Sequence, residues 1–424
     1  MINSRLIKIS SLTFVSTLVK MLTSFFTNKI VALFVGPNGL AIIGQFGNFI
    51  GIFSSISTGG VTAGTTKFVS EYKTQPEKCK PYIIFTLQLS VLISVISGII
   101  IIFLSNFASN HIFGNAKYST IITIFGITLL FYSLNSALLS IINGFGYYKN
   151  YVIINIINSI VGFTFTIVLV ILWKLEGALL AMVTYQSVIF LITFFFIRNL
   201  QYFTWNEFFQ KINRSVRNDL FQYTLMTLLG TILYPIAQII IRNYLILNVS
   251  LADAGIWEGL NRISNIYIIF ITSTLSVYYL PRLSELQSNY EIMNEVLNTL
   301  KIITPFLLIS IFLVVSLRDN VILLLFSKEF ISMRGLFIVQ FIALFVKVIG
   351  WLIAYPMLAK KMTKKFISTE ILYNICWVLI SIPLINHYGI QGAVVGYLIT
   401  YIIYLIYVVI IMKPYLFITH HGAN

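Results

Sequence analysis

The sequence has few charged residues: Asp, Glu, Lys and Arg make up 10% of its 424 residues, against about 25% in soluble domains. Hydrophobic side chains make up 58%, which leaves too little polar surface to cover a soluble protein. The apolar stretches are continuous and lack the alternation over about 10 residues that marks membrane β-strands. These deficits exclude a soluble domain, and we expect an all-α polytopic membrane protein.

Residue types that carry out chemistry are also scarce. The two cysteines, Cys79 and Cys376, lie in a basic loop and in an apolar run, so we expect no disulfide and no metal site. The sequence contains no phosphate-binding glycine loop and no His-Glu-x-x-His motif, and its four histidines fall in loops or the tail. We therefore expect no catalytic residue, no bound metal and no cofactor, which favours a transporter over an enzyme.

Twelve apolar runs are long enough to cross a membrane, at about 20 residues each. They cover residues 9–35, 40–66, 82–106, 118–143, 151–173, 177–198, 219–247, 255–281, 300–317, 335–359, 366–386 and 390–412. The connections between them are short, so we expect no added soluble domain. Turns are predicted at Gly36-Pro-Asn-Gly39 and at Leu175-Glu-Gly177.

Basic residues are distributed unevenly among these connections. If the N-terminus is cytoplasmic, seventeen Lys and Arg fall in cytoplasmic segments and five in outer ones. This asymmetry predicts that both termini are cytoplasmic. It also accounts for the net charge of +15, so we expect no nucleic-acid partner.

Sequence features recur between the two halves of the chain. Lys67-Phe-Val-Ser-Glu71 corresponds to Pro281-Arg-Leu-Ser-Glu285 at an offset of 214 residues. Further matches pair the cations Lys29 and Arg242, and the predicted turn glycines Gly39 and Gly255. We therefore predict two six-helix repeats, residues 1–210 and 211–424, with the substrate in a cleft between them.

Cations inside the apolar runs are the candidate functional residues. Lys20 and Lys347 project near the bilayer midplane, and Lys29 and Arg242 to the outer half. A charge at the bilayer centre costs about 2.5–3.5 kcal/mol, so such residues indicate a water-filled, cation-lined cavity that binds an anion. Among them, Lys20, Arg242 and Lys347 have no evident neutralising neighbour.

The spacing of these charges leaves several alternatives open. Lys20 and Lys29 are nine residues apart, about half a turn on a straight helix, so either the helix bends or only one lysine faces the cavity. Lys29 also lies near enough to a span end to reach the interface. Glu258 and Arg262 are four residues apart and favour an intrahelical pair. We expect Glu370 to pair with the lysines of residues 360–365.

Several longer motifs resemble a known family. These are Gly36-Pro-Asn-Gly-Leu40, Gly59-Gly-Val-Thr-Ala-Gly-Thr-Thr-Lys-Phe-Val-Ser-Glu71, Gly255-Ile-Trp-Glu-Gly-Leu-Asn-Arg-Ile-Ser-Asn265, Thr274-Leu-Ser-Val-Tyr-Tyr-Leu-Pro-Arg-Leu-Ser284 and Phe330-Ile-Ser-Met-Arg-Gly-Leu-Phe337. The chain resembles the Wzx-type flippases for lipid-linked O-antigen units, of the multidrug/oligosaccharidyl-lipid/polysaccharide exporter superfamily. The resemblance extends over nearly the whole chain.

This resemblance implies two six-helix lobes around a V-shaped, alternating-access cavity. It implies transport of an undecaprenyl-pyrophosphate-linked oligosaccharide, the O-antigen repeat unit, from the cytoplasmic to the periplasmic leaflet of the bacterial inner membrane. It places Lys20, Lys29, Arg242 and Lys347 in the cavity, whereas Arg262 and Glu258 stand where uncharged residues are expected in relatives. It also implies Na⁺ or H⁺ coupling as a candidate, membrane lipid as surroundings, and an O-antigen polymerase and chain-length regulator as candidate partners.

Two alternatives remain. A multidrug antiporter of the same superfamily would carry organic cations and would need acidic residues, which are few in these runs. A membrane-embedded polysaccharide polymerase or ligase would need a long outer loop with clustered basic residues, and the outer connections are short.

Overall fold

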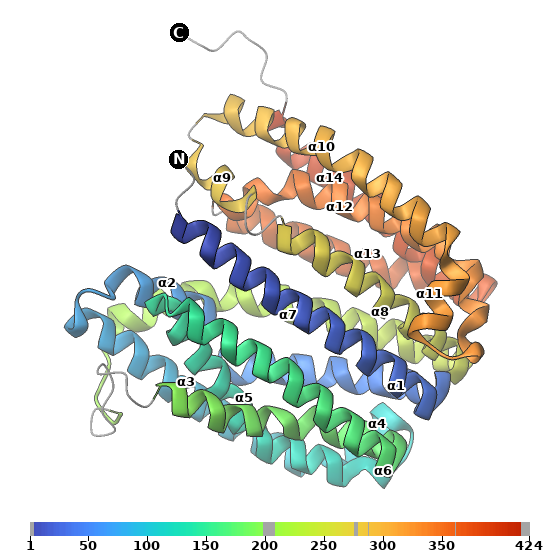
Figure 1. Cartoon of the computed structure of the whole chain (residues 1–424), viewed down its shortest axis with the longest axis horizontal. Helices are drawn as coiled ribbons and strands as arrows, with labels where there is room; N and C mark the ends of the chain where they lie inside the picture. The colour runs from blue at the N-terminus through green and yellow to red at the C-terminus, as the bar shows by residue number, and fades with distance from the viewer. Residues whose placement is uncertain (1–3, 198–207, 275–278, 287, 361, 417–424) are drawn as a thin grey trace. The chain divides into compact units, whose positions relative to one another are not determined.

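The computed structural model describes residues 4–197, 208–274, 279–286, 288–360 and 362–416, and over these residues the chain is helical and contains no strand (Figure 1). In chain order the elements are α1 (Ser4–Ser57), α2 (Thr62–Tyr72), α3 (Pro76–Phe103), α4 (Ser105–Phe113), η1 (Ala116–Tyr118), α5 (Ser119–Phe145), α6 (Tyr148–Ile197), α7 (Arg214–Asn248), α8 (Leu251–Thr274), α9 (Leu280–Glu285), α10 (Asn289–Ser316), α11 (Arg318–Leu325), η4 (Lys328–Leu336), α12 (Phe337–Ala359), α13 (Thr363–Tyr388) and α14 (Ile390–Leu416).

Two of the helices are each broken by a kink. Helix α1 breaks at Gly36, whose φ of 62° and ψ of −171° favour glycine, and Pro37 follows. Helix α6 breaks at Trp173 and at Lys174, a non-glycine residue with a φ of 47°. Each kinked helix therefore corresponds to two of the predicted apolar runs.

Within the described residues, nine helices are long and apolar enough to cross a membrane. The two kinked helices contribute spans of 44 and 50 residues, so these nine account for eleven of the twelve predicted runs. The remaining run corresponds to α8, which carries Asp253, Glu258 and Arg262. The prediction of an all-α polytopic membrane protein is confirmed.

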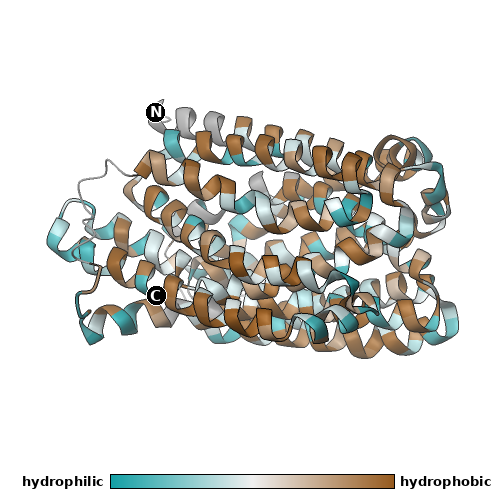
Figure 2. Ribbon diagram, turned by 90° about the horizontal axis from the view of Figure 1, so that it is seen from below, coloured by the Kyte–Doolittle hydropathy of each residue, from teal (hydrophilic) through white to brown (hydrophobic). Residues whose placement is uncertain are grey.

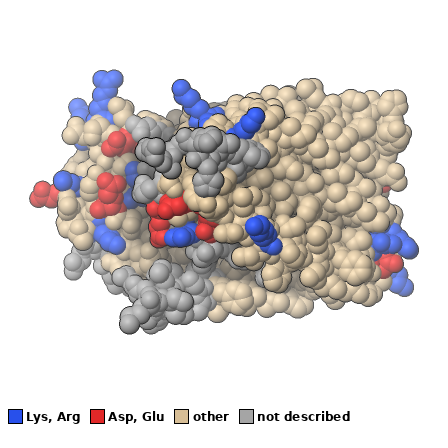
Figure 3. Space-filling model, turned by 90° about the horizontal axis from the view of Figure 1, so that it is seen from above, with Lys and Arg blue, Asp and Glu red and all other residues tan. Residues whose placement is uncertain are grey.

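Polar residues collect at helix ends. Hydrophobic residues cover most of each long helix, and hydrophilic ones concentrate near the ends and in the connections (Figure 2). On the face shown in Figure 3, Lys, Arg, Asp and Glu lie over the left and middle of the view and at its right edge, and a wide zone between them carries no charge. This pattern is the one expected of helices whose central parts lie in hydrocarbon.

Contacts between residues divide the chain into two compact units. Unit 1 consists of Met1–Val35 and Ile42–Ile236, and unit 2 of Gly36–Ala41 and Ala237–Asn424. The first part of α7 thus groups with the preceding helices, and the grouping changes one residue after Pro235. This position lies later in the chain than residue 210, where the sequence predicts the lobes to divide.

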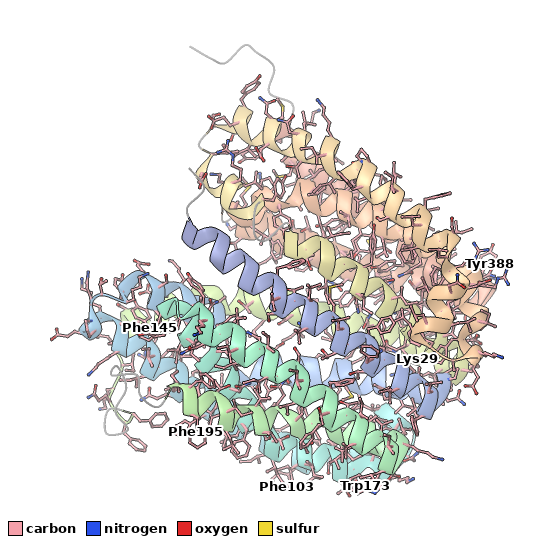
Figure 4. The ribbon with its side chains drawn as sticks, viewed as in Figure 1. Lys29, Phe103, Phe145, Trp173, Phe195 and Tyr388 are labelled. Atoms are coloured by element: carbon pink, nitrogen blue, oxygen red, sulfur yellow. The ribbon has the colours of Figure 1, made fainter. Side chains whose placement is uncertain are left out.

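In unit 1, α3, α5 and α6 run side by side (Figure 1). Figure 4 labels Phe103 and Trp173 at one end of these helices and Phe145 and Phe195 at the other, so successive segments alternate in direction. Helices α3 and α5 approach closely at Gly98, where an added Cβ would lie 2.5 Å from the carbonyl oxygen of Gly126.

In unit 2, α12 and α13 both pack against α14. Gly396 lies against Ser381, where an added Cβ would be 2.5 Å from the hydroxyl oxygen, and Gly350 lies against Tyr404. Small residues therefore set how closely these helices pack. The turn predicted at Gly36-Pro-Asn-Gly39 is confirmed by the break of α1 at Gly36, although Gly39 itself is helical. The prediction that Gly255 is a turn residue is wrong, because Gly255 lies within α8 and packs against the carbonyl oxygen of Pro37.

Candidate functional site

The two lysines of α1 lie on an uninterrupted stretch of helix. The only residue of α1 with non-helical backbone angles is Gly36, so no break separates Lys20 from Lys29. Nine residues at about 100° each place their side chains on opposite faces. Lys20 is exposed and Lys29 is half-buried, and Figure 4 shows Lys29 toward the same end of unit 1 as Trp173. The alternative in which the helix bends between the two lysines is therefore wrong.

Arg242, from the second part of α7, lies in a buried charge cluster of unit 2. Its side chain is 0% exposed, and Nη2 lies 2.6 Å from Oε2 of Glu258 on α8. Its guanidinium carbon is 5.4 Å from the centre of the Trp257 ring. The expectation that Arg242 has no neutralising neighbour is wrong, because a contact between two helices brings Glu258 to it.

Glu258 bridges two arginines. Its second carboxylate oxygen, Oε1, accepts a hydrogen bond from Nε of Arg262 at 2.9 Å. The predicted pair four residues apart on α8 is thus confirmed, and it forms one half of a triad. The triad holds two positive charges and one negative charge. Arg262 is its partly exposed member, whereas the side chain of Arg242 is fully buried.

Lys347, on α12, is 5% exposed and lies in a cage of aromatic side chains. Its Nζ donates a hydrogen bond to the hydroxyl of Tyr397 at 3.1 Å. The same atom is 4.6 Å from the ring centre of Trp351 and 5.3 Å from that of Tyr401. Aromatic faces stabilise an ammonium that is removed from water. Lys347 is therefore held within unit 2 by α12 and α14 together.

Glu370, on α13, is the carboxyl group that interacts electrostatically with Lys347. The expectation that Lys347 lacks a neutralising neighbour is therefore wrong. The pairing of Glu370 with the lysines of residues 360–365 stays a prediction, because Lys361 lies outside the described residues. Lys347 and Glu370 are far apart in sequence, and only the packing of α12 and α13 brings them close. A buried charge with an opposite partner is far less costly than an isolated one.

Sequence reasoning did not single out the aromatic residues of this region. Tyr397, Tyr401 and Tyr404 repeat at a spacing of four and three residues, which places them on one face of α14. This spacing is the sequence pattern from which an aromatic face on α14 could have been predicted. Trp257 and Trp377 contact each other with ring centres 6.3 Å apart and join α8 to α13.

Unit 2 also holds buried amide groups near these tryptophans. Asn261 lies four residues after Trp257, and Asn374 three residues before Trp377. Within the described residues, Nδ2 of Asn261 and Oδ1 of Asn374 have no hydrogen-bond partner. The polar interior of unit 2 therefore keeps hydrogen-bonding capacity beyond its ion pairs. For the predicted site residues Lys20, Lys29, Arg242 and Lys347, a role in substrate binding stays a prediction.

Comparison with known proteins identifies relatives over the whole chain. The family model described as "Polysaccharide biosynthesis protein" matches residues 6–287. The Lipid III flippase of Escherichia coli (strain K12) is 28% identical over 399 residues, which cover 94% of this chain and 96% of that protein.

Solved structures with the same fold are known in two states. An inward-facing multidrug resistance MATE family transporter of the MOP superfamily matches with a TM-score of 0.79 and 14% identity, over 94% of this chain and 98% of that one. An outward-facing conformation of such a transporter matches with a TM-score of 0.68 and 15% identity, over 97% and 96%. At these identities the likeness shows the fold alone.

Proposed function

The chain belongs to the polysaccharide biosynthesis protein family, and from this premise we propose that it is a flippase for an anionic, lipid-linked oligosaccharide. The similarity to the Lipid III flippase over 94% of the chain supports this assignment. The substrate class we propose is an undecaprenyl-pyrophosphate-linked oligosaccharide. It would move from the cytoplasmic to the periplasmic leaflet of the bacterial inner membrane, with both termini of the protein cytoplasmic.

The observation that carries the proposal is the sign of the charge inside the apolar helices. Lys20 and Lys29 lie on α1, and the triad around Glu258 contains two arginines and one glutamate. The remaining pair, Lys347 with Glu370, is balanced. A diphosphate is bound well by Lys and Arg in surroundings of low dielectric constant. The surplus of positive charge therefore suits an anionic headgroup, and it disfavours an organic cation.

Exposure divides the candidate cations into two kinds. Lys20 and Arg262 are accessible to a ligand, whereas Arg242 and Lys347 are buried. We assign direct contact with the headgroup during transport to Lys20 within unit 1 and, separately, to Arg262 within unit 2. Arg242 acts through Glu258, because it fixes the carboxylate that orients Arg262. Lys347 supports the packing of α12 on α14.

The solved relatives support alternating access as the transport mechanism, because the same fold exists in inward-facing and outward-facing states. With the cell interior negative, outward movement of an anion is favoured by about 2.3 kcal/mol per charge per 100 mV. The membrane potential is thus a sufficient driving force for export. A coupled Na⁺ or H⁺ step is the alternative, and it would appear as dependence on the ion gradient at constant potential.

Complementation tests the proposal. The gene is expressed in an Escherichia coli strain that lacks its own Lipid III flippase and in strains that lack an O-antigen flippase, and surface polysaccharide is measured. We expect restored display in at least one strain, and loss of display for the Lys20→Gln, Arg262→Gln double variant. A chain that is inserted in the membrane and restores none of these strains, but confers resistance to cationic drugs or polymerises lipid-linked sugars when purified, would overturn the assignment.

A further inference from the structure

Exposed basic side chains gather at one end of unit 1. Lys73 and Lys78 flank the turn between α2 and α3, and Lys211, Arg214 and Arg217 lie at the start of α7. All five are exposed, and within the described part of the chain no ion pair links any of them to an acidic group. These five residues are called the basic face below.

Two hydrogen bonds hold the segment around the start of α7 against α3. The hydroxyl of Tyr82 donates to Oδ2 of Asp219 at 2.8 Å, between residues 137 positions apart. Nε2 of Gln88 donates to the backbone oxygen of Gln210 at 3.1 Å. The buried Val216 packs in the same apolar cluster as Tyr82. The two halves of the basic face are therefore joined into one surface by the fold.

Aromatic side chains accompany these cations. The rings of Phe68 and Tyr72 both stack on the ring of Tyr82, with ring centres 4.7 and 5.7 Å from its centre. Nζ of Lys78 lies 6.0 Å from the Tyr72 ring. Phe209, next to the basic face, is 86% exposed. Tyr and Phe beside Lys and Arg are typical of the interface between lipid and water.

The charge of this surface is strongly positive after its acids are counted. Oε2 of Glu71 lies 4.0 Å from Nζ of Lys67, so the charge of Lys67 offsets that of Glu71. Glu77 is exposed and Asp219 accepts the bond from Tyr82, so among the described residues two carboxylates stand against the five cations. The surface is also close to the bilayer, because the span of α3 begins at Pro76.

We propose that the basic face binds the headgroups of anionic phospholipids, with Phe209 inserted at the edge of the bilayer. Clusters of four to eight Lys and Arg next to a membrane helix attract anionic lipid over about one Debye length. The bound lipid stays in the membrane and is not transported, so this site is distinct from the flippase function. The basic face differs from scattered basic residues in loops because the packing of α2, α3 and α7 holds its cations in one surface.

Binding is measured on the purified full-length protein in neutral detergent, with fluorescent phosphatidylglycerol as the probe and fluorescent phosphatidylcholine as the comparison. We expect tighter binding of phosphatidylglycerol, weakened as salt rises from about 0.1 to about 1 M and the Debye length falls from about 10 to about 3 Å. The quadruple variant Lys73→Gln, Lys78→Gln, Arg214→Gln, Arg217→Gln should lose about tenfold or more in affinity for phosphatidylglycerol. If the quadruple variant does not fold, two double variants replace it: Lys73→Gln with Lys78→Gln, and Arg214→Gln with Arg217→Gln. Each should lose part of the affinity for phosphatidylglycerol.

A matched control removes the same charge elsewhere. Lys149, Lys174, Lys328 and Lys413 are exposed and lie outside the basic face, so their quadruple change to Gln should leave the affinity within about twofold if binding is local. An equal loss in this control would show that net charge alone attracts the lipid and would overturn the proposal. Displacement of the lipid by millimolar inorganic phosphate would identify a free-anion site, and binding only of an acidic protein would identify a protein-docking surface; both outcomes contradict it.

The Tyr82→Phe variant tests the role of the fold. It removes the hydrogen bond to Asp219 and changes no charge. If the basic face must be assembled from its two halves, affinity for phosphatidylglycerol should fall about two- to threefold, as expected for loss of one hydrogen bond. Unchanged affinity in Tyr82→Phe, together with loss in the quadruple variant, would mean that the cations act independently and would refute the joined surface.

Discussion

Arg242 and Glu258 form an ion pair inside unit 2, with Nη2 and Oε2 2.6 Å apart and the arginine side chain fully buried. The same carboxylate holds Arg262 through its other oxygen. Glu258 is therefore a partner that both guanidiniums share. Since Arg242 has no access to solvent, removal of its partner and removal of Arg262 should have different consequences.

The Glu258→Gln variant should be strongly destabilised. It leaves two guanidiniums facing each other across a neutral amide, and breaking a buried pair by removing one partner costs about 3–5 kcal/mol. The apparent melting temperature of the purified protein measures the loss. Glu176→Gln is the matched control, because it breaks the exposed pair with Lys117, which is worth about 0–1 kcal/mol. Equal melting temperatures for the two variants would contradict the buried ion pair.

Arg262→Gln should separate transport from stability. Arg262 is partly exposed and can contact a ligand, whereas Arg242→Gln removes a buried group and leaves Glu258 with one partner. We expect Arg262→Gln to lower polysaccharide export about tenfold or more, as for loss of a charge-assisted hydrogen bond, with a small change in melting temperature. Arg242→Gln should lower both polysaccharide export and the melting temperature. Export at the unmodified level in Arg262→Gln would exclude Arg262 from the substrate path.

Lys20 and Lys29 should not contribute equally to export. They point to opposite faces of an unbroken helix, and Lys20 is the exposed one. Lys20→Gln is expected to lower surface polysaccharide about tenfold or more, and Lys29→Gln to lower it much less. The double variant should match Lys20→Gln. If the two single losses were equal and multiplied in the double variant, both lysines would have to face the substrate, against the observed helix.

Much of the fold follows from local properties of the sequence. The apolar runs are set by the length of a membrane helix, and the break at Gly36 by a glycine followed by proline. The turn predicted at Leu175-Glu-Gly177 lies directly after the observed break at Trp173 and Lys174. The sequence did not predict that the positive φ falls on Lys174, because a non-glycine residue in that conformation is stabilised by its surroundings. Gly255 was misread as a turn because its role is to let α8 approach Pro37.

The candidate site was predicted only where partners are close in sequence. Glu258 and Arg262 are one helical turn apart, and this pair was found. The ion pair of Arg242 with Glu258 joins two helices, and the electrostatic interaction of Lys347 with Glu370 links two others. No local pattern reports such contacts. The sequence-based inference that these cations were unpaired therefore failed at Arg242 and at Lys347.

The last prediction concerns Lys347 and Glu370. Lys347→Met keeps a long apolar side chain among Trp351 and Tyr401, but it removes the hydrogen bond to Tyr397 and leaves Glu370 without its opposite charge. We expect this variant to be destabilised, and Glu370→Gln likewise, because each removes one member of a buried pair of opposite charges. The double variant Lys347→Met, Glu370→Gln should be more stable than the sum of the single losses implies, by a coupling energy of about 0.5–3 kcal/mol. Tyr397→Phe is the control that removes the hydrogen bond and keeps both charges. Strictly additive losses in melting temperature would show that the two charges do not interact, and the cage would then hold Lys347 through its aromatic faces alone.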